Sequence, residues 1–138
     1  MPAKNKNKIA PQKSKTKYQL EFLIRSSPRI LYPYLSTSDG LGDWFADKVQ
    51  EKGKNMFIFK WQDAQAEAEL ISKKENHHVR FKWVAEPADT YFQFDIVLDE
   101  MTSEVALMIT DFATDDQKEE NSLLWNSQVH ALMHVIGA

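Results

Sequence analysis

Between residues 17 and 112, apolar and polar side chains alternate in a series of short segments, the pattern of strands buried on one face. The first segment places four apolar residues on one side: Tyr18, Leu20, Phe22 and Ile24. The pattern then predicts strands over residues 56–61, 64–71, 78–84 and 91–98, and a strand that is apolar on both faces over 105–112. Short polar turns separate these later segments, so we expect an antiparallel meander.

Two short helices are predicted between the first strand and the meander. Ser27 is a good N-cap and Pro28 suits the first helical position, so a helix should run to about Ser36. Pro33 lies inside it, where proline costs about 3 kcal/mol, so we expect this helix to be bent or to end early. Residues 37–39 offer a new cap for a second helix. That helix would bring three apolar residues onto one face: Leu41, Trp44 and Phe45.

A long amphipathic helix is predicted at the end of the chain. Thr114 and Gln117 match a capping box, with Thr114 as N-cap and Gln117 three positions later. The helix should continue to about residue 136. At 100° per residue, its apolar stripe contains Trp125, Val129, Leu132 and Ile136.

The charge is distributed unevenly along the 138 residues, although the net charge is only -3. Residues 1–20 carry six lysines and no acidic residue, whereas the remainder carries a net charge of -9. We expect residues 1–16 to be a disordered basic arm, because they contain few apolar residues, and residues 17–138 to be a single domain. The chain has no cysteine and no apolar run of 18 residues, which fits a cytoplasmic protein without a membrane span.

One strand, two short helices, a meander and a long final helix are the elements of a helix-grip fold, in the α+β class. The segments that carry a family resemblance are LEFLIRSSPRILYPYLSTSDGLGDWFAD, AEAEL, VRFKW, ALMITDFA and the final VIGA. Through them the chain resembles START-like domain proteins of the Bet v 1-like (SRPBCC) superfamily, near the Hsp90-ATPase-activator-homology-1 branch. The resemblance covers about residues 17–138. It implies a curved antiparallel sheet of six to seven strands wrapped around the C-terminal helix.

The resemblance also implies a cavity between the sheet and the final helix that holds a hydrophobic small molecule or a lipid. The spacing alone favours the other interpretation, an aromatic stripe that simply fills the core under the helix. We take as candidate ligand-binding residues the inward-facing aromatic and aliphatic side chains, with Ala68 leaving room between bulky neighbours. They are Trp44, Phe45, Phe57, Phe59, Trp61, Ala68, Phe81, Trp83, Phe92, Phe94, Leu107, Ile109, Trp125, Val129 and Leu132.

Catalytic and metal-binding motifs are weak in this sequence. There is no cysteine nucleophile, no GxSxG element and no glycine-rich phosphate loop. His130 and His134 have the i, i+4 spacing of a zinc pair, but they fall on the polar side of the helix and no third ligand is evident. We therefore expect no metal and no cofactor, and we favour a non-enzymatic function. Asp111, on the inward face of a strand, is the one carboxylate we nominate if the domain is an enzyme.

Three functions remain open on the sequence. The first is a hydrophobic ligand-binding domain. The second is a co-chaperone-like protein-interaction domain that uses exposed aromatics near Trp44 and Phe45. The third is a cyclase- or hydrolase-type enzyme acting in the same cavity. We expect a monomer or a homodimer and no specific nucleic-acid partner, because the lysine arm lacks interleaved aromatics and arginines.

Overall fold

The computed structural model describes residues 14–138. The predicted basic arm therefore lies almost wholly outside the described residues. The predicted domain begins within them.

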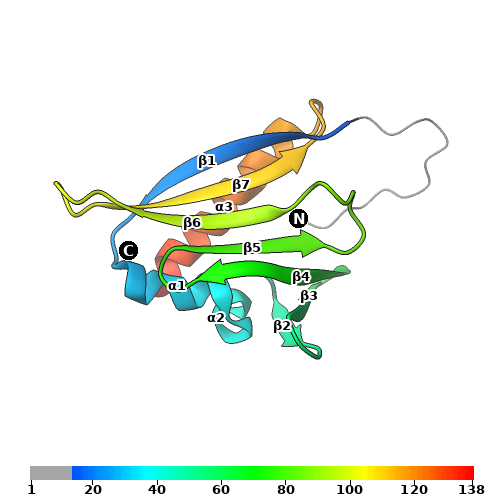
Figure 1. Ribbon diagram of the computed structural model, residues 1–138, viewed down its shortest axis with the longest axis horizontal. Helices are drawn as coiled ribbons and strands as arrows, with labels where there is room; N and C mark the ends of the chain where they lie inside the picture. Colours follow the sequence, from blue (N-terminus) through cyan, green and yellow to red (C-terminus); the bar gives the residue numbers. More distant parts are fainter. Residues whose placement is uncertain (1–13) are drawn as a thin grey trace.

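Seven strands form one antiparallel sheet, in the order β1-β7-β6-β5-β4-β3-β2. All strands after β2 follow one another as neighbours, and β1 closes the order by pairing with β7, from Thr16 opposite Ala113 to Ile24 opposite Val105. Figure 1 shows the curved sheet with α3 (Lys118–Ile136) crossing behind it, and with the two short helices at one end. The predicted α+β helix-grip fold is confirmed. The strands are β1 (Thr16–Ile24), β2 (Lys48–Glu51), β3 (Met56–Trp61), β4 (Ala64–Lys74), β5 (His78–Trp83), β6 (Phe92–Leu98) and β7 (Val105–Ala113).

The two short helices after β1 begin where the sequence predicts. α1 (Pro28–Ser36) begins where Ser27 Oγ accepts a hydrogen bond from the Ile30 N–H at 3.2 Å, and it continues through Pro33. α2 (Ser38–Gly42) is capped by Thr37, whose hydroxyl oxygen accepts from the Gly40 N–H at 2.9 Å.

The two short helices approach each other closely at Gly40. A Cβ atom at this position would lie 2.2 Å from the Pro33 carbonyl oxygen and 2.6 Å from the Tyr34 Cα. These are backbone atoms that cannot move aside. Gly40 is therefore required for α2 to fold back on α1 and to direct the following residues under the sheet.

The predicted capping box at the last helix is wrong. The Thr114 hydroxyl donates to the Asp116 carboxylate at 2.6 Å, residues 115–117 form a turn, and α3 starts only at Lys118. Gln117 takes the N-cap position without a side-chain cap bond. The Gln117 N–H, which a capping box would direct to the Thr114 hydroxyl oxygen, donates to the Thr114 carbonyl oxygen at 3.0 Å. The other end matches the prediction, since α3 ends at Ile136, before Gly137 in the left-handed conformation.

The strands differ from the prediction by more than one residue in two places. β2 was not predicted, because four residues of mixed polarity carry no clear period. β4 extends three residues beyond its predicted end, and its register with β5 shifts between Leu70 and Ser72, where a bulge interrupts the alternation.

The core lies between the concave face of the sheet and α3, and the side chains of Trp125, Val129 and Leu132 are fully buried in it. Among residues 14–138, no helix is long and apolar enough to cross a membrane.

Candidate ligand-binding site

A dense aromatic cluster occupies the space between the sheet and α3. Phe45, which follows α2, lies at its centre and is 1% exposed. Its ring centroid is 5.2 Å from that of Phe59, 5.7 Å from that of Phe92 and 5.7 Å from that of Trp125. The ring of Phe45 thus bridges β3, β6 and α3. We call the following residues the aromatic cluster: Phe45, Phe57, Phe59, Trp61, Phe81, Trp83, Phe92, Phe94 and Trp125.

The backbone at Phe45 fixes this ring in place. Its carbonyl oxygen accepts hydrogen bonds from Trp61 Nε1 at 3.0 Å and from Gln128 Nε2 at 2.9 Å. The sheet and the last helix are therefore both tied to the residue that fills the space between them. The Gln128 amide oxygen is buried and has no hydrogen-bond partner among the described residues.

The structure brings the predicted ligand-binding residues together, but as packed side chains. All are buried except Trp61, which is half-buried. A ligand can occupy the volume between sheet and helix only if rings such as Phe45 move. The members outside the aromatic cluster, all in the surrounding core, are Trp44, Ala68, Leu107, Ile109, Val129 and Leu132.

The expectation of exposed aromatics at Trp44 and Phe45 is wrong. Trp44 is 7% exposed and its indole N–H donates to the Tyr34 carbonyl oxygen at 2.7 Å. The close packing of α1 and α2 turns both rings inward. A protein-interaction surface would have to consist of other residues.

Asp111 is buried at the junction of β7, β1 and α3. Its Oδ2 atom accepts from the Tyr18 hydroxyl at 3.1 Å and from Trp125 Nε1 at 2.9 Å. Its Oδ1 atom accepts from the Phe112 N–H at 2.8 Å. Burial and the nearby Asp111 carboxylate raise the pKa of Tyr18 far above its ordinary value. Both carboxylate oxygens are thus occupied by structural hydrogen bonds.

His130 and His134 lie on the exposed side of α3. His130 Nδ1 lies 2.9 Å from the carbonyl oxygen of Asn126, one turn earlier in the same helix. Within residues 14–138, no three metal-ligating side chains come together.

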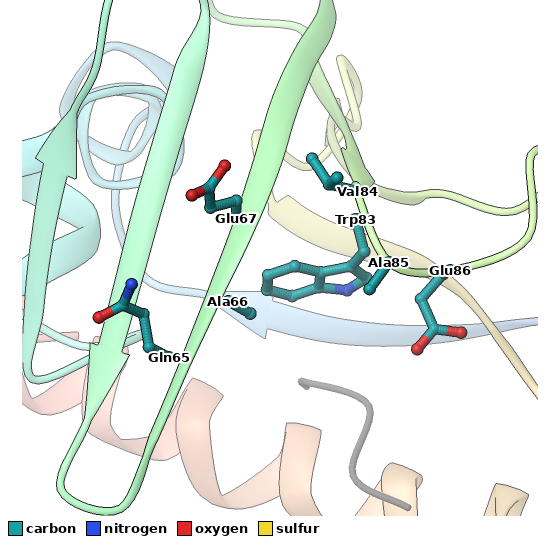
Figure 2. A pocket seen from close by; sticks show the side chains of 7 residues that line it. All are labelled: Gln65, Ala66, Glu67, Trp83, Val84, Ala85 and Glu86. Carbon is teal, nitrogen blue, oxygen red and sulfur yellow. The ribbon is translucent and has the colours of Figure 1, made fainter. Parts of the chain in front are cut away.

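A pocket of about 460 Å³ opens where β4 separates from the turn that follows β5. We call it the Trp83 pocket. Figure 2 shows the Trp83 indole lying across it towards Ala66, with the carboxylates of Glu67 and Glu86 on opposite sides. The lining residues are Gln65, Ala66, Glu67, Trp83, Val84, Ala85 and Glu86.

Trp83 connects this pocket to the aromatic cluster. Its ring centroid is 4.8 Å from that of Phe92 and 5.5 Å from that of Phe59. It is also the one indole in the described chain whose N–H has no hydrogen-bond partner, since those of Trp44, Trp61 and Trp125 are all bonded. The base of the pocket is thus an apolar ring with a free donor.

The two carboxylates that line the Trp83 pocket differ in whether they have an ionic partner. Glu86 forms an ion pair with Lys15, whereas the half-buried Glu67 carboxylate has no partner among the described residues. The Lys82 ammonium group bonds the carbonyl oxygens of Trp83 at 2.6 Å and Glu86 at 2.7 Å. Burial is the main cause that lowers the pKa of Lys82.

Of the candidate residues taken from the sequence, only Trp83 lines this pocket. Gln65, Glu67 and Glu86 were not predicted, because alternation assigns Gln65 and Glu67 to the outer face and Glu86 to a turn. The available signal was the run of small and acidic residues beside aromatic strand ends, in AQAEAE and WVAEP.

Comparison with known proteins gives a consistent family assignment. A family model described as START-like superfamily domain matches residues 12–138. The solution structure of BfR322 from Bacteroides fragilis is 34% identical, covers 90% of this chain and 92% of its own, and has a TM-score of 0.63. No curated protein matches the chain.

Two further solved structures share the fold at low identity. The Aha1 dimer from Colwellia psychrerythraea is 17% identical, covers 88% of this chain and 96% of its own, and has a TM-score of 0.74. MLL2253 from Mesorhizobium loti is 14% identical, covers 88% of this chain and 97% of its own, and has a TM-score of 0.71. The extent of the family match and the similarity to the Bacteroides protein lead to one conclusion: this chain belongs to the START-like superfamily.

Proposed function

We propose that this START-like domain is a non-enzymatic, cytoplasmic binding domain for a hydrophobic small molecule or a lipid, and that the ligand docks in the Trp83 pocket. The observation that carries the proposal is the pocket itself. Its volume of about 460 Å³ falls within the usual range for small-molecule sites, and its base is a large aromatic ring.

The position of the ligand differs from the one expected on the sequence. The aromatic cluster fills the centre of the space between sheet and α3, with Phe45, Phe59, Phe81 and Phe92 almost fully buried. The Trp83 pocket instead lies at the edge of this cluster. A long ligand could extend inward from it only by displacing Trp83.

The free N–H of Trp83 provides a direct test. In the ¹H–¹⁵N spectrum of the full chain, the neutral hydrophobic probe N-phenyl-1-naphthylamine should shift the Trp83 indole signal more than the other three indole signals. The Trp83→Phe variant assigns the signal. If the probe shifts all four indole signals equally or none at all, the Trp83 pocket is not its binding site.

A matched pair of variants tests the pocket sterically. Ala66 lines the pocket, whereas Ala64 lies two residues earlier on the same face of β4 and is exposed outside it. Ala66→Leu should weaken binding of the probe by about tenfold, because its added methyl groups occupy pocket volume. Ala64→Leu should leave binding unchanged. Equal effects of the two variants would contradict the proposed site.

Protein interaction is a second candidate function, and exposed apolar side chains at one end of the sheet favour it. Leu23 and Val97 both pair with Ala106 across the sheet, and Leu98 and Met101 extend the surface into the β6–β7 hairpin, where Met101 is 95% exposed. The Colwellia relative is described as a dimer, so we propose a second copy as the first partner to test. Sedimentation velocity of wild type and of Met101→Ser would reveal it, since a dimer through this end should weaken in the variant.

A further inference from the structure

We propose that the ligand of the Trp83 pocket carries an amine, so that the domain selects amphipathic cations over neutral or acidic molecules of the same shape. This inference rests on the proposed function and names the ligand class of the same site.

The wall of the Trp83 pocket is acidic. The described lining residues include two carboxylates, Glu67 and Glu86, and no cationic side chain. Lys82 lies close by, but its ammonium group is directed to the carbonyl oxygens of the turn at 2.6 and 2.7 Å. The charged groups of the lining that a ligand meets are therefore both carboxylates.

The Trp83 indole lines the same pocket as the two carboxylates, and Figure 2 draws it with Glu67 and Glu86 on opposite sides. An ammonium group over the face of tryptophan is attracted by the negative face of the ring, and tryptophan is the strongest partner for this contact. A cation in the pocket would therefore have an aromatic ring as well as carboxylates in the surrounding wall. The apolar remainder of the ligand would lie against Ala66, Val84 and Ala85.

The chain itself places an ammonium group at one of the two carboxylates. Lys15, at the start of the described chain, reaches Glu86, and the side chains in this pair are only 25% and 10% exposed. The pair shows that this wall of the pocket accommodates a partly buried primary amine. Glu67, half-buried and unpartnered within the described residues, offers the equivalent position on the opposite wall.

Three probes of one shape test the preference: 4-phenylbutylamine, 4-phenylbutan-1-ol and 4-phenylbutyrate, titrated into the full chain while the Trp83 indole signal is followed. We expect the amine to bind at least fivefold more tightly than the alcohol and the carboxylate to bind most weakly. The preference for the amine should fall between 0.05 and 0.5 M NaCl, because salt screens a partly exposed ion pair.

Two variants on β4 form a matched pair for the charge. Glu67→Gln should weaken binding of the amine about fivefold and leave binding of the alcohol unchanged, as expected for loss of one partly exposed ion pair. Glu69→Gln removes the same charge from the same strand at an exposed position outside the pocket and should change neither. Lys15→Ala should tighten amine binding by about threefold, because it releases Glu86.

The outcomes separate the two proposals. If amine and alcohol bind equally at Trp83, or if Glu67→Gln weakens both, the amine preference is overturned and the hydrophobic ligand-binding function stands. If none of the three probes shifts the Trp83 signal and N-phenyl-1-naphthylamine also fails to do so, both proposals are overturned.

Discussion

The buried carboxylate of Asp111 should contribute strongly to the stability of the domain. It accepts hydrogen bonds from the Tyr18 hydroxyl at 3.1 Å and from Trp125 Nε1 at 2.9 Å, and so joins β7 to both β1 and α3. Asp111→Ala leaves two buried donors without a partner, and each costs about 1–3 kcal/mol. We therefore expect a loss of roughly 2–6 kcal/mol, a large fraction of the roughly 5–15 kcal/mol that stabilises a domain.

Asp111→Asn separates the hydrogen bonds from the charge. The amide oxygen can replace Oδ2 and accept from both donors, so at this atom only the difference between charged and neutral acceptors is lost. That difference is about 1 kcal/mol for each bond, which predicts a loss of about 2 kcal/mol at Oδ2. The bond from the Phe112 N–H to Oδ1 is lost in both variants, because the asparagine NH2 group cannot accept it. Asp95→Ala is the control. Asp95 is half-buried on the outer face of β6, where its partner Gln93 is not fully buried, so the change should stay within about 0.5 kcal/mol.

Urea denaturation followed by circular dichroism measures all three variants through linear extrapolation. The indole signal of Trp125 reports whether its bond survives in Asp111→Asn. If Asp111→Ala costs less than about 1 kcal/mol, or if alanine and asparagine cost the same, the bonds at Oδ2 do not stabilise the fold as argued. If the alanine variant fails to fold, the asparagine variant and the Asp95 control still decide the question.

Three further changes have expected outcomes. Gly40→Ala should destabilise the domain by more than about 2 kcal/mol in urea denaturation, because its Cβ would lie 2.2 Å from the Pro33 carbonyl oxygen. Gly42→Ala is the control and should be neutral or slightly stabilising, because its Cβ would have no atom nearer than 4.0 Å. Equal effects of the two variants would contradict the close approach of α1 and α2. Phe45→Ala should cost about 3–5 kcal/mol, since it empties the centre of the aromatic cluster, and a loss below about 1 kcal/mol would show that the ring is not tightly packed. Because the pKa of Tyr18 is raised in the folded chain, its neutral form is favoured there. The contribution of Tyr18 to stability should therefore be constant below about pH 10 and fall by up to about 1.4 kcal/mol for each pH unit above it. Tyr18→Phe should make that alkaline decline less steep, and an unchanged slope would refute the assignment.

Local signals were sufficient for most of the fold. Alternation located β1 and β3 to β6, and an apolar run located β7. Ser27 with Pro28 marked the start of α1, because these signals depend on neighbours in the sequence. The predicted start of α3 was wrong because the Gln117 N–H bonds the Thr114 carbonyl oxygen and not the Thr114 hydroxyl, a choice between two local acceptors that the pattern does not decide.

The site was less accessible to sequence analysis because it depends on contacts between distant segments. Phe45 is central only because Gly40 lets α2 fold onto α1, so that the following residues pass under the sheet. The Trp83 pocket forms where β4 and the turn after β5 diverge, and its lining residue Glu86 is paired with Lys15, far away in the chain. The periodicity of apolar residues does not predict such contacts between distant segments.

The pairing of the first strand with the last has a consequence for how the protein is made. β1 forms its backbone hydrogen bonds only with β7, so this pairing cannot be completed until Ala113 has left the ribosome. At a synthesis rate of about 5–20 residues per second, that wait lasts roughly 5–20 s. During this time the apolar face of β1, with Tyr18, Leu20 and Phe22, has no strand beside it. The nascent chain therefore carries an unpaired, half-apolar strand through most of its synthesis, and this is the stage at which a chaperone that binds extended apolar segments would find it.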